Sequence, residues 1–162
     1  DSELRDLYQE VVLDHGRKPR NFRRRPEGAN RDAEGYNPLC GDRVCVHLAV
    51  DADGRIRDAA FEGAGCAISM ASTSLMTEIL KGKSAAEAEA LAQAFYRLVK
   101  GEAADQAIAD EDDMDRLHVL AGVAEFPMRV KCATLAWHTM QAALERGAAA
   151  KAEPVVTTEE AG

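Results

Sequence analysis

One switch of hydrophobic period, just before Cys66, constrains the fold of this chain more than any other feature. In "RVCVHLAVDADGRIRDAAFEG", residues 43–63, apolar side chains alternate with the others, which is typical of a strand with one buried face. Asp53 and Gly54 form a turn dipeptide, so the segment predicts a β-hairpin. Two strands alone would be marginally stable, and we therefore expect a third strand that is short or hidden in the pattern.

Outside the hairpin, several segments carry apolar residues every three or four positions, a spacing that predicts helices. Ser84 and Glu87 add a capping-box pattern at the start of one of them. The expected helices cover residues 2–16, 66–81, 84–101, 113–123 and 132–147. Residues 17–38 show no period and are interpreted as an extended loop. We expect one domain over residues 1–147 and a disordered tail over 148–162, which is small and polar.

The composition excludes several classes of protein. With 162 residues, of which 46% are apolar and 30% charged, the chain has the make-up of a globular domain. It contains neither an apolar run near the roughly 20 residues of a membrane span nor the apolar core of a signal peptide, so we expect a cytoplasmic protein and no membrane partner. Disulfides are disfavoured in a reducing cytosol, so the four cysteines favour metal binding or thiol chemistry, although no C-x-x-C pair is present.

The net charge of −8 is unevenly distributed. The segment from Arg17 to Arg31 contains seven basic residues and one acid, whereas Gly101 to Asp115 contains seven acids and no base. A basic stripe can bind nucleic acid, but this one has Phe22 as its single aromatic residue and belongs to an acidic protein. We therefore expect no nucleic-acid partner, and interpret the stripe as a solvated face or as a docking surface for an acidic protein.

Three of the four cysteines fall where the backbone favours a thiolate or a metal ligand. Cys40 lies beside Asp42 in the Pro/Gly turn "NPLCGD", and Cys66 and Cys132 each fall in the first turn of an expected helix. A helix N-terminus lowers a thiol pKa by roughly one unit, which yields a partial thiolate. A bound metal would deprotonate the thiols fully, and zinc accepts sulfur and carboxylate ligands in a tetrahedral set. Cys40, Asp42, Cys66 and Cys132 are therefore a candidate metal site.

Other interpretations of the cysteines stay open from the residues alone. Taken singly, each is more often a small buried core residue than a ligand. Cys45 lies on the strand face opposite the Val/Leu stripe, where an exposed or partner-covered thiol is expected. In "CVH" it shares that face with His47, so the two are also an i, i+2 candidate ligand pair.

Three motifs resemble those of a known family. "NPLCGD", "GAGCAIS" and "RVKCATLAW" are similar to the cysteine motifs of the U-type iron–sulfur cluster assembly proteins, the IscU/NifU N-terminal/SufU family, and "LYQEVVLDHGRKPRNF" is similar to that family's N-terminal segment. The resemblance extends to about Gly147. Two features resemble the SufU branch: Lys131 stands where the scaffold branch has a histidine, and about twenty residues around 101–122 resemble that branch's insertion.

The resemblance implies an α+β fold, with helices packed on a small antiparallel sheet, and zinc or an iron–sulfur cluster at the cysteines. Cys40, Asp42, Cys66 and Cys132 would be the ligands. Cys40 would also accept sulfane sulfur from the persulfide of a PLP-dependent, SufS-like cysteine desulfurase. Cys45 matches no functional cysteine of the family. Two basic residues beside the last cysteine are placed to steady anionic sulfur or to be solvated loop charges: Arg129 and Lys131.

Three functional hypotheses follow. The first is a zinc-dependent sulfur acceptor, at most a sulfurtransferase that acts with a cysteine desulfurase and supplies downstream iron–sulfur assembly proteins. The second is a scaffold on which a 2Fe–2S cluster is assembled and passed to apo-proteins. The third is a purely structural zinc fold. Lys131 and the insertion favour the first, because the missing histidine belongs to the scaffold's site.

Overall fold

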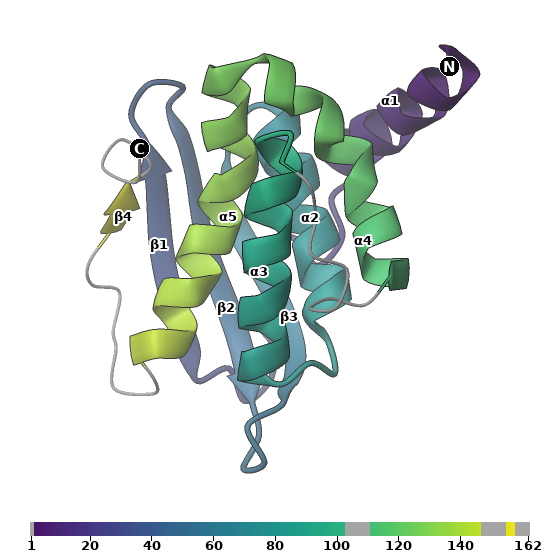
Figure 1. The fold of residues 1–162 in the computed structure, drawn as a ribbon. Helices are drawn as coiled ribbons and strands as arrows, with labels where there is room; N and C mark the ends of the chain where they lie inside the picture. The colour runs from purple at the N-terminus through teal and green to yellow at the C-terminus, as the bar shows by residue number, and fades with distance from the viewer. Residues whose placement is uncertain (1, 103–110, 147–154, 158–162) are drawn as a thin grey trace.

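The computed structural model of this protein describes residues 2–102, 111–146 and 155–157. Its centre is one sheet with the strand order β3-β2-β1-β4 (Figure 1). The strands are β1 (Arg31–Asn37), β2 (Asp42–Val50), β3 (Ile56–Ala64) and β4 (Val155–Thr157). Strands β1 and β2 pair antiparallel, as do β2 and β3, and the predicted hairpin is the β2–β3 pair.

Helices cover one face of this sheet and give the α+β fold that was expected. They are α1 (Ser2–Arg17), α2 (Ala67–Leu80), α3 (Ala85–Val99), α4 (Glu111–Leu117), the 3₁₀ helix η1 (His118–Glu125) and α5 (Pro127–Arg146). Figure 1 shows α2, α3 and α5 in front of the sheet, while α1 projects to the side. None of the helices within the described ranges is long and apolar enough to cross a membrane.

Of two helix starts predicted from the sequence, the structure confirms one and shows that the other is wrong. Ser84 caps α3 through the predicted capping box, since its side chain accepts from the Glu87 N–H and the Glu87 carboxylate accepts in return. The last helix begins at Pro127 rather than at Cys132. Proline suits the first helical position because its φ is preset and no N–H is needed there. The short helix expected over 113–123 is α4 followed by η1.

Strand β1 corrects the prediction of an extended loop over 17–38. Its buried residues are Ala33, Gly35 and Asn37, which are too small or too polar to give an apolar alternation. At Gly35 the helix α5 comes so close that an added Cβ would collide with Thr139 Oγ1. This is the hidden third strand, and it was hidden because close packing against a helix replaces large side chains.

The core lies between the sheet and the helices. Val44, Val46 and Leu48 of β2 are fully buried and point toward the helices, as their alternation predicted. On the helix side, Phe95 and Trp137 are fully buried and stack with ring centroids 4.9 Å apart. Burial of this aliphatic and aromatic surface is the dominant favourable term for the fold.

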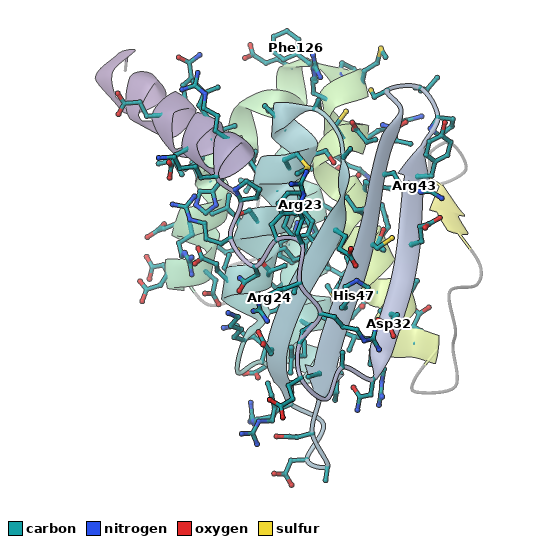
Figure 2. The ribbon with its side chains drawn as sticks, turned by 180° about the vertical axis from the view of Figure 1, so that it is seen from behind. Arg23, Arg24, Asp32, Arg43, His47 and Phe126 are labelled. Atoms are coloured by element: carbon teal, nitrogen blue, oxygen red, sulfur yellow. The ribbon has the colours of Figure 1, made fainter. Side chains whose placement is uncertain are left out.

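The other face of the sheet, the outer face, is crossed by no helix in the described part of the chain (Figure 2). Residues 21–23 run along the free edge of β3, where the Phe61 N–H donates to the Asn21 carbonyl at 2.9 Å and the Arg23 N–H donates to the Phe61 carbonyl at 2.8 Å. Within the predicted tail, β4 pairs in parallel with β1, a strand that the sequence did not predict. The remaining residues of the tail lie outside the described ranges.

Candidate metal centre

The stretch "NPLCGD" is the tight connection between β1 and β2. Asn37 and Asp42 pair across the ladder, and both are fully buried. The chain reverses because the Gly41 N–H donates to the Asn37 carbonyl at 2.8 Å and Gly41 takes a φ of +73°, which glycine adopts without strain. Cys40 therefore lies exposed at the tip of this connection, while the acid two residues later is buried.

Asp42 joins this connection to the start of α2. Its Oδ1 accepts from the Cys66 N–H at 2.9 Å, and its Oδ2 lies 3.7 Å from Cys66 Sγ. The carboxylate fits there because residue 65 is glycine, at which an added Cβ would lie 2.7 Å from Asp42 Oδ1. Cys66 is the N-cap residue of α2, as the sequence predicted for a thiol at a helix start.

Cys132 supplies the third sulfur from inside α5, and it is fully buried. Its Sγ lies 3.3 Å from Cys40 Sγ and accepts from Asn37 Nδ2 at 3.8 Å. The prediction that Cys132 stands in the first turn of its helix is wrong, because α5 starts at Pro127. The helix dipole therefore does not set the pKa of the Cys132 thiol, which depends on the neighbouring groups instead.

These positions form a donor set suited to a metal. The ligand atoms of Cys40, Asp42 and Cys132 lie within 4.8 Å of one another, and Cys66 adjoins the group through Asp42. Two thiolates on one tetrahedral zinc are about 3.8 Å apart when each Zn–S bond is about 2.3 Å. The Cys40–Cys132 separation of 3.3 Å is near that value, so these two sulfurs and the Asp42 carboxylate suit zinc, whereas Cys66 is not within 4.8 Å of all three ligand atoms.

The two inner cysteines share one proton unequally. A hydrogen bond from Cys132 lowers the pKa of the Cys66 thiol to about 6, against the cost of burial, and the backbone N–H groups of Ser69 and Ile68 add to this effect. The same hydrogen bond to Cys66, together with burial, raises the pKa of Cys132. Without a metal, Cys66 is thus the thiolate at neutral pH and Cys132 holds the proton.

Of the two basic residues predicted to support the site, Arg129 lies near the sulfurs. The negative charge of Cys66, the largest cause, raises the pKa of its guanidinium. Lys131 is half-buried in α5 next to Cys132. Neither is a metal ligand, since both side chains are cationic donors.

Cys45 lies apart from this site, on the outer face of the sheet. It is half-buried, whereas an exposed or partner-covered thiol was expected, and its thiol donates to Glu34 Oε2 at 3.4 Å. Burial and the Glu34 carboxylate raise the pKa of Cys45 to about 11. His47 shares this face, and Figure 2 shows it beside Asp32.

Three of the seven basic residues of the stripe pair with acids of the same chain. Arg20 pairs with Asp14 at 2.6 Å, Arg24 pairs with Asp58 at 2.8 Å, and Arg25 pairs with Asp32. These pairs favour the interpretation as a solvated face, because little unpaired charge is left at those three arginines for a partner.

Sequence reasoning missed an apolar fringe on the two segments that lead into the cysteine site. Leu39 is 53% exposed just before Cys40, and Phe126 and Met128 are 60% and 56% exposed at the start of α5. Contiguous exposed apolar patches mark protein contact surfaces, and these three residues lie on the two segments that carry Cys40 and Cys132. The sequence carries no signal for them, because exposure depends on where the helix begins.

Comparison with family models adds an independent finding. Residues 7–133 match the model of the NifU-like N-terminal domain. A Bacillus subtilis (strain 168) protein called zinc-dependent sulfurtransferase SufU is 40% identical over 149 residues, which cover 90% of this chain and 92% of that protein. A Streptococcus pyogenes serotype M1 protein called iron–sulfur cluster assembly scaffold protein IscU is 41% identical over 153 residues, covering 93% and 90%.

Solved structures agree with this fold. A crystal structure described as a putative iron–sulfur cluster assembly scaffold protein for the SUF system, from Fervidobacterium islandicum AW-1, superposes with a TM-score of 0.74 at 36% identity. The match covers 83% of this chain and 94% of that one. An N-terminal NifU-like protein from Brucella abortus has the same fold, with a TM-score of 0.75 over 88% of this chain and 95% of that one at 24% identity.

Proposed function

The chain belongs to the family of NifU-like N-terminal domains, and within that family we propose that it is an iron–sulfur cluster assembly protein that accepts persulfide sulfur at a zinc-bound cysteine site. The partner would be a PLP-dependent, SufS-like cysteine desulfurase in the cytoplasm, where thiols stay reduced. The 40% identity to the protein called zinc-dependent sulfurtransferase SufU supports this choice.

One observation carries the proposal: an exposed thiol is joined to a buried donor set. Cys40 is exposed at the tip of its turn, whereas Asp42 and Cys132 are buried, and all three offer ligand atoms within 4.8 Å of one another. Zinc bound by Cys40, Asp42, Cys66 and Cys132 would hold the thiols as thiolates without redox chemistry. Cys40 is the most exposed of the three sulfurs, and so the one that a partner reaches first.

Sulfur transfer needs a thiolate that can attack. The Cys40 sulfur attacks the outer sulfur of a persulfide on the desulfurase, and the S–S bond of that persulfide breaks. The desulfurase cysteine leaves as a thiolate, and Cys40 becomes the persulfide. No net oxidation or reduction occurs, because sulfane sulfur passes from one cysteine to another.

Two neighbouring features suit this step. Arg129 lies near the sulfurs and would offset the negative charge that the incoming persulfide brings. Leu39, Phe126 and Met128 are exposed apolar side chains on the segments that carry the site, and a docked desulfurase would cover them. We propose this fringe, rather than the partly paired basic stripe, as the desulfurase contact.

The test is desulfurase stimulation. Zinc-loaded protein is added to a PLP-dependent cysteine desulfurase with cysteine and a reductant, and sulfide release is followed. We expect Cys40→Ser to abolish the stimulation. Asp53→Ser changes an exposed turn residue at the far end of β2 and serves as the control, with stimulation retained. Full stimulation by Cys40→Ser would overturn the proposal.

A second candidate function is supported by the 41% identical protein called an IscU scaffold. Three cysteines and one aspartate would also suit a 2Fe–2S cluster, which is held by thiolates. Iron and acid-labile sulfide in near-equal amounts in anaerobically purified protein, with a visible absorption band, would favour the scaffold. About one zinc per site and no sulfide would favour the sulfur acceptor.

A further inference from the structure

One buried hydroxyl group beside the cysteine site has no hydrogen-bond partner in the described part of the chain. It belongs to Ser69, which is fully buried in α2. Burying a hydroxyl without a partner costs free energy, so such a group in a native fold calls for an explanation. Ser69 follows Cys66 by three residues, which places this hydroxyl in the first turn of the helix that Cys66 caps.

The other buried hydroxyl groups of α2 all have partners. Ser72 Oγ donates to the Ala133 carbonyl oxygen at 2.6 Å, and Thr73 Oγ1 donates to the Ser69 carbonyl oxygen at 2.7 Å. Ser74 Oγ accepts from the Arg20 N–H at 2.8 Å, and Thr77 Oγ1 donates to the Ser74 carbonyl oxygen at 2.7 Å. Within this helix, the unpartnered hydroxyl is therefore the one nearest in sequence to the metal centre.

The position of Ser69 in the helix directs its side chain toward Cys66. Residues three apart lie on one face of a helix, and helical side chains lean toward the helix N-terminus. The Ser69 hydroxyl therefore lies over the turn that Cys66 begins. The main chain of this turn already binds the same sulfur, because the N–H groups of Ile68 and Ser69 donate to Cys66 Sγ.

Metal binding leaves the Cys66 sulfur with room for a further donor. In this structure Cys66 is hydrogen-bonded to the Cys132 thiol. A bound metal deprotonates the thiols that it coordinates, so Cys132 can no longer donate to Cys66. A serine hydroxyl is a donor that rotates to suit an acceptor, and that of Ser69 is free to take the vacated place.

We propose that Ser69 is a positioning residue of the metal centre, whose hydroxyl donates to the Cys66 thiolate when zinc is bound. This inference rests on the zinc site proposed above, with Cys66 as one of its ligands. Hydrogen bonds to a metal ligand fix its orientation, and their loss typically weakens metal affinity about 10–100-fold. With two N–H donors and one hydroxyl, Cys66 is the sulfur that stays on the metal, and the exposed Cys40 is the one that a partner displaces.

Cobalt(II) titration of the metal-free protein tests the inference, because a cobalt-bound thiolate gives a near-ultraviolet charge-transfer band. We expect Ser69→Ala to weaken cobalt binding about 10–100-fold. The band should also move to longer wavelength, because a sulfur that loses a hydrogen bond holds its lone pairs less tightly. Urea unfolding of the metal-free variant should show equal or higher stability, because the change removes an unpartnered polar group. A merely structural role would lower the stability and leave the band in place.

Thr77→Ala is the matched control. It removes a buried hydroxyl from the same helix, about three turns beyond Cys66. The Thr77 hydroxyl donates to the Ser74 carbonyl oxygen and accepts from Asn21 Nδ2, so its loss should lower the stability of the metal-free protein. Cobalt affinity and the position of the band should stay unchanged.

Cys66→Ser separates this inference from the site on which it rests, and it should itself weaken cobalt binding. Cobalt binding that Cys66→Ser weakens, but that Ser69→Ala leaves unchanged in affinity and in band position, would overturn the role of Ser69 alone. No cobalt binding by the unmodified protein, or binding that Cys66→Ser leaves unchanged, would overturn the proposed ligand set and the role of Ser69 together.

Discussion

Cys66 and Cys45 are both half-buried, yet the molecule drives their ionisation in opposite directions. A hydrogen bond from Cys132, with the N–H groups at the start of α2, lowers the pKa of Cys66 to about 6. Burial beside the Glu34 carboxylate raises the pKa of Cys45 to about 11. Both sulfurs lie beside a carboxylate, Asp42 or Glu34, but at Cys66 the hydrogen-bond donors outweigh it. The neighbours and not the degree of burial therefore decide which thiol is nucleophilic.

A similar contrast separates the cysteine site, at one end of the sheet, from the outer face. The end of the sheet that bears Cys40 and Asp42 gathers sulfurs from three segments around one carboxylate. The outer face instead gathers carboxylates around one thiol and one imidazole. Sulfur chemistry at neutral pH therefore takes place in the first region, and Cys45 stays a protonated thiol.

Removing zinc should have the largest effect and should act on the cysteine site. A ligand that binds only the folded state stabilises it by about 4 kcal/mol when its concentration is about 1,000 times its Kd. We expect chelation to lower the thermal midpoint of the unmodified protein and to abolish sulfur acceptance. An unchanged thermal midpoint after complete removal of zinc would contradict the prediction that zinc at the cysteine site stabilises the fold.

Gly65→Ala should damage the cysteine site without removing a ligand. The added methyl group would lie 2.7 Å from Asp42 Oδ1, so the carboxylate must move away from Cys66. Overpacking of this kind costs about 1–3 kcal/mol. Zinc affinity and unfolding free energy should both fall, as calorimetry and denaturant titration would measure. Gly54→Ala is the control for zinc affinity, since an added Cβ there meets open space and the altered turn lies far from the site.

Alkylation of the metal-free protein compares the two thiols directly. At pH 8 a pKa of about 6 against about 11 makes the thiolate population of Cys66 roughly 1,000-fold larger. Nucleophilicity falls with pKa and removes about two powers of ten, so we expect Cys66 to react roughly 10-fold faster. As pH falls, the Cys66 rate should drop through about pH 6, while the Cys45 rate should still be rising near pH 11. Mass spectrometry of iodoacetamide-treated peptides would measure both profiles, and equal rates would contradict the contrast.

The smallest effect should come from Arg129. Its guanidinium is exposed and faces the charge of Cys66, so Arg129→Gln should raise the pKa of that thiol only slightly. We expect a roughly twofold slower alkylation of Cys66 near pH 6, in line with weak exposed ion pairs. Arg129→Lys keeps the charge and should restore most of the rate. A loss that lysine does not restore would indicate a steric role instead.

Strands with large apolar side chains could be predicted from the sequence, and a strand with small ones could not. The β2–β3 hairpin followed from the alternation of Val44, Val46 and Leu48, whose burial is complete. Strand β1 was missed because its inward positions include Gly35, which close packing against α5 requires. The start of α5 was missed because Pro127 was interpreted as part of a loop, although it is the first residue of the helix.

The sequence likewise predicted some residues of the polar and cysteine clusters and not others. Local turns and helix starts were enough to single out Cys40, Asp42 and Cys66. The pairing of His47 with both Asp32 and Glu62 was not predictable, because it depends on the register of three strands. Contacts set by one segment are visible in a sequence, whereas contacts set by the alignment of several segments are not.

The central claim is that Cys40 receives sulfur in a zinc site, and one measurement tests it most directly. Zinc-loaded protein is mixed with a cysteine desulfurase carrying a persulfide, quenched by alkylation, and mapped by peptide mass spectrometry. We expect a single added sulfur on the peptide that contains Cys40, and none on the peptide that contains Cys45. Added sulfur on another cysteine, with Cys40 unmodified, would contradict the proposed role of Cys40.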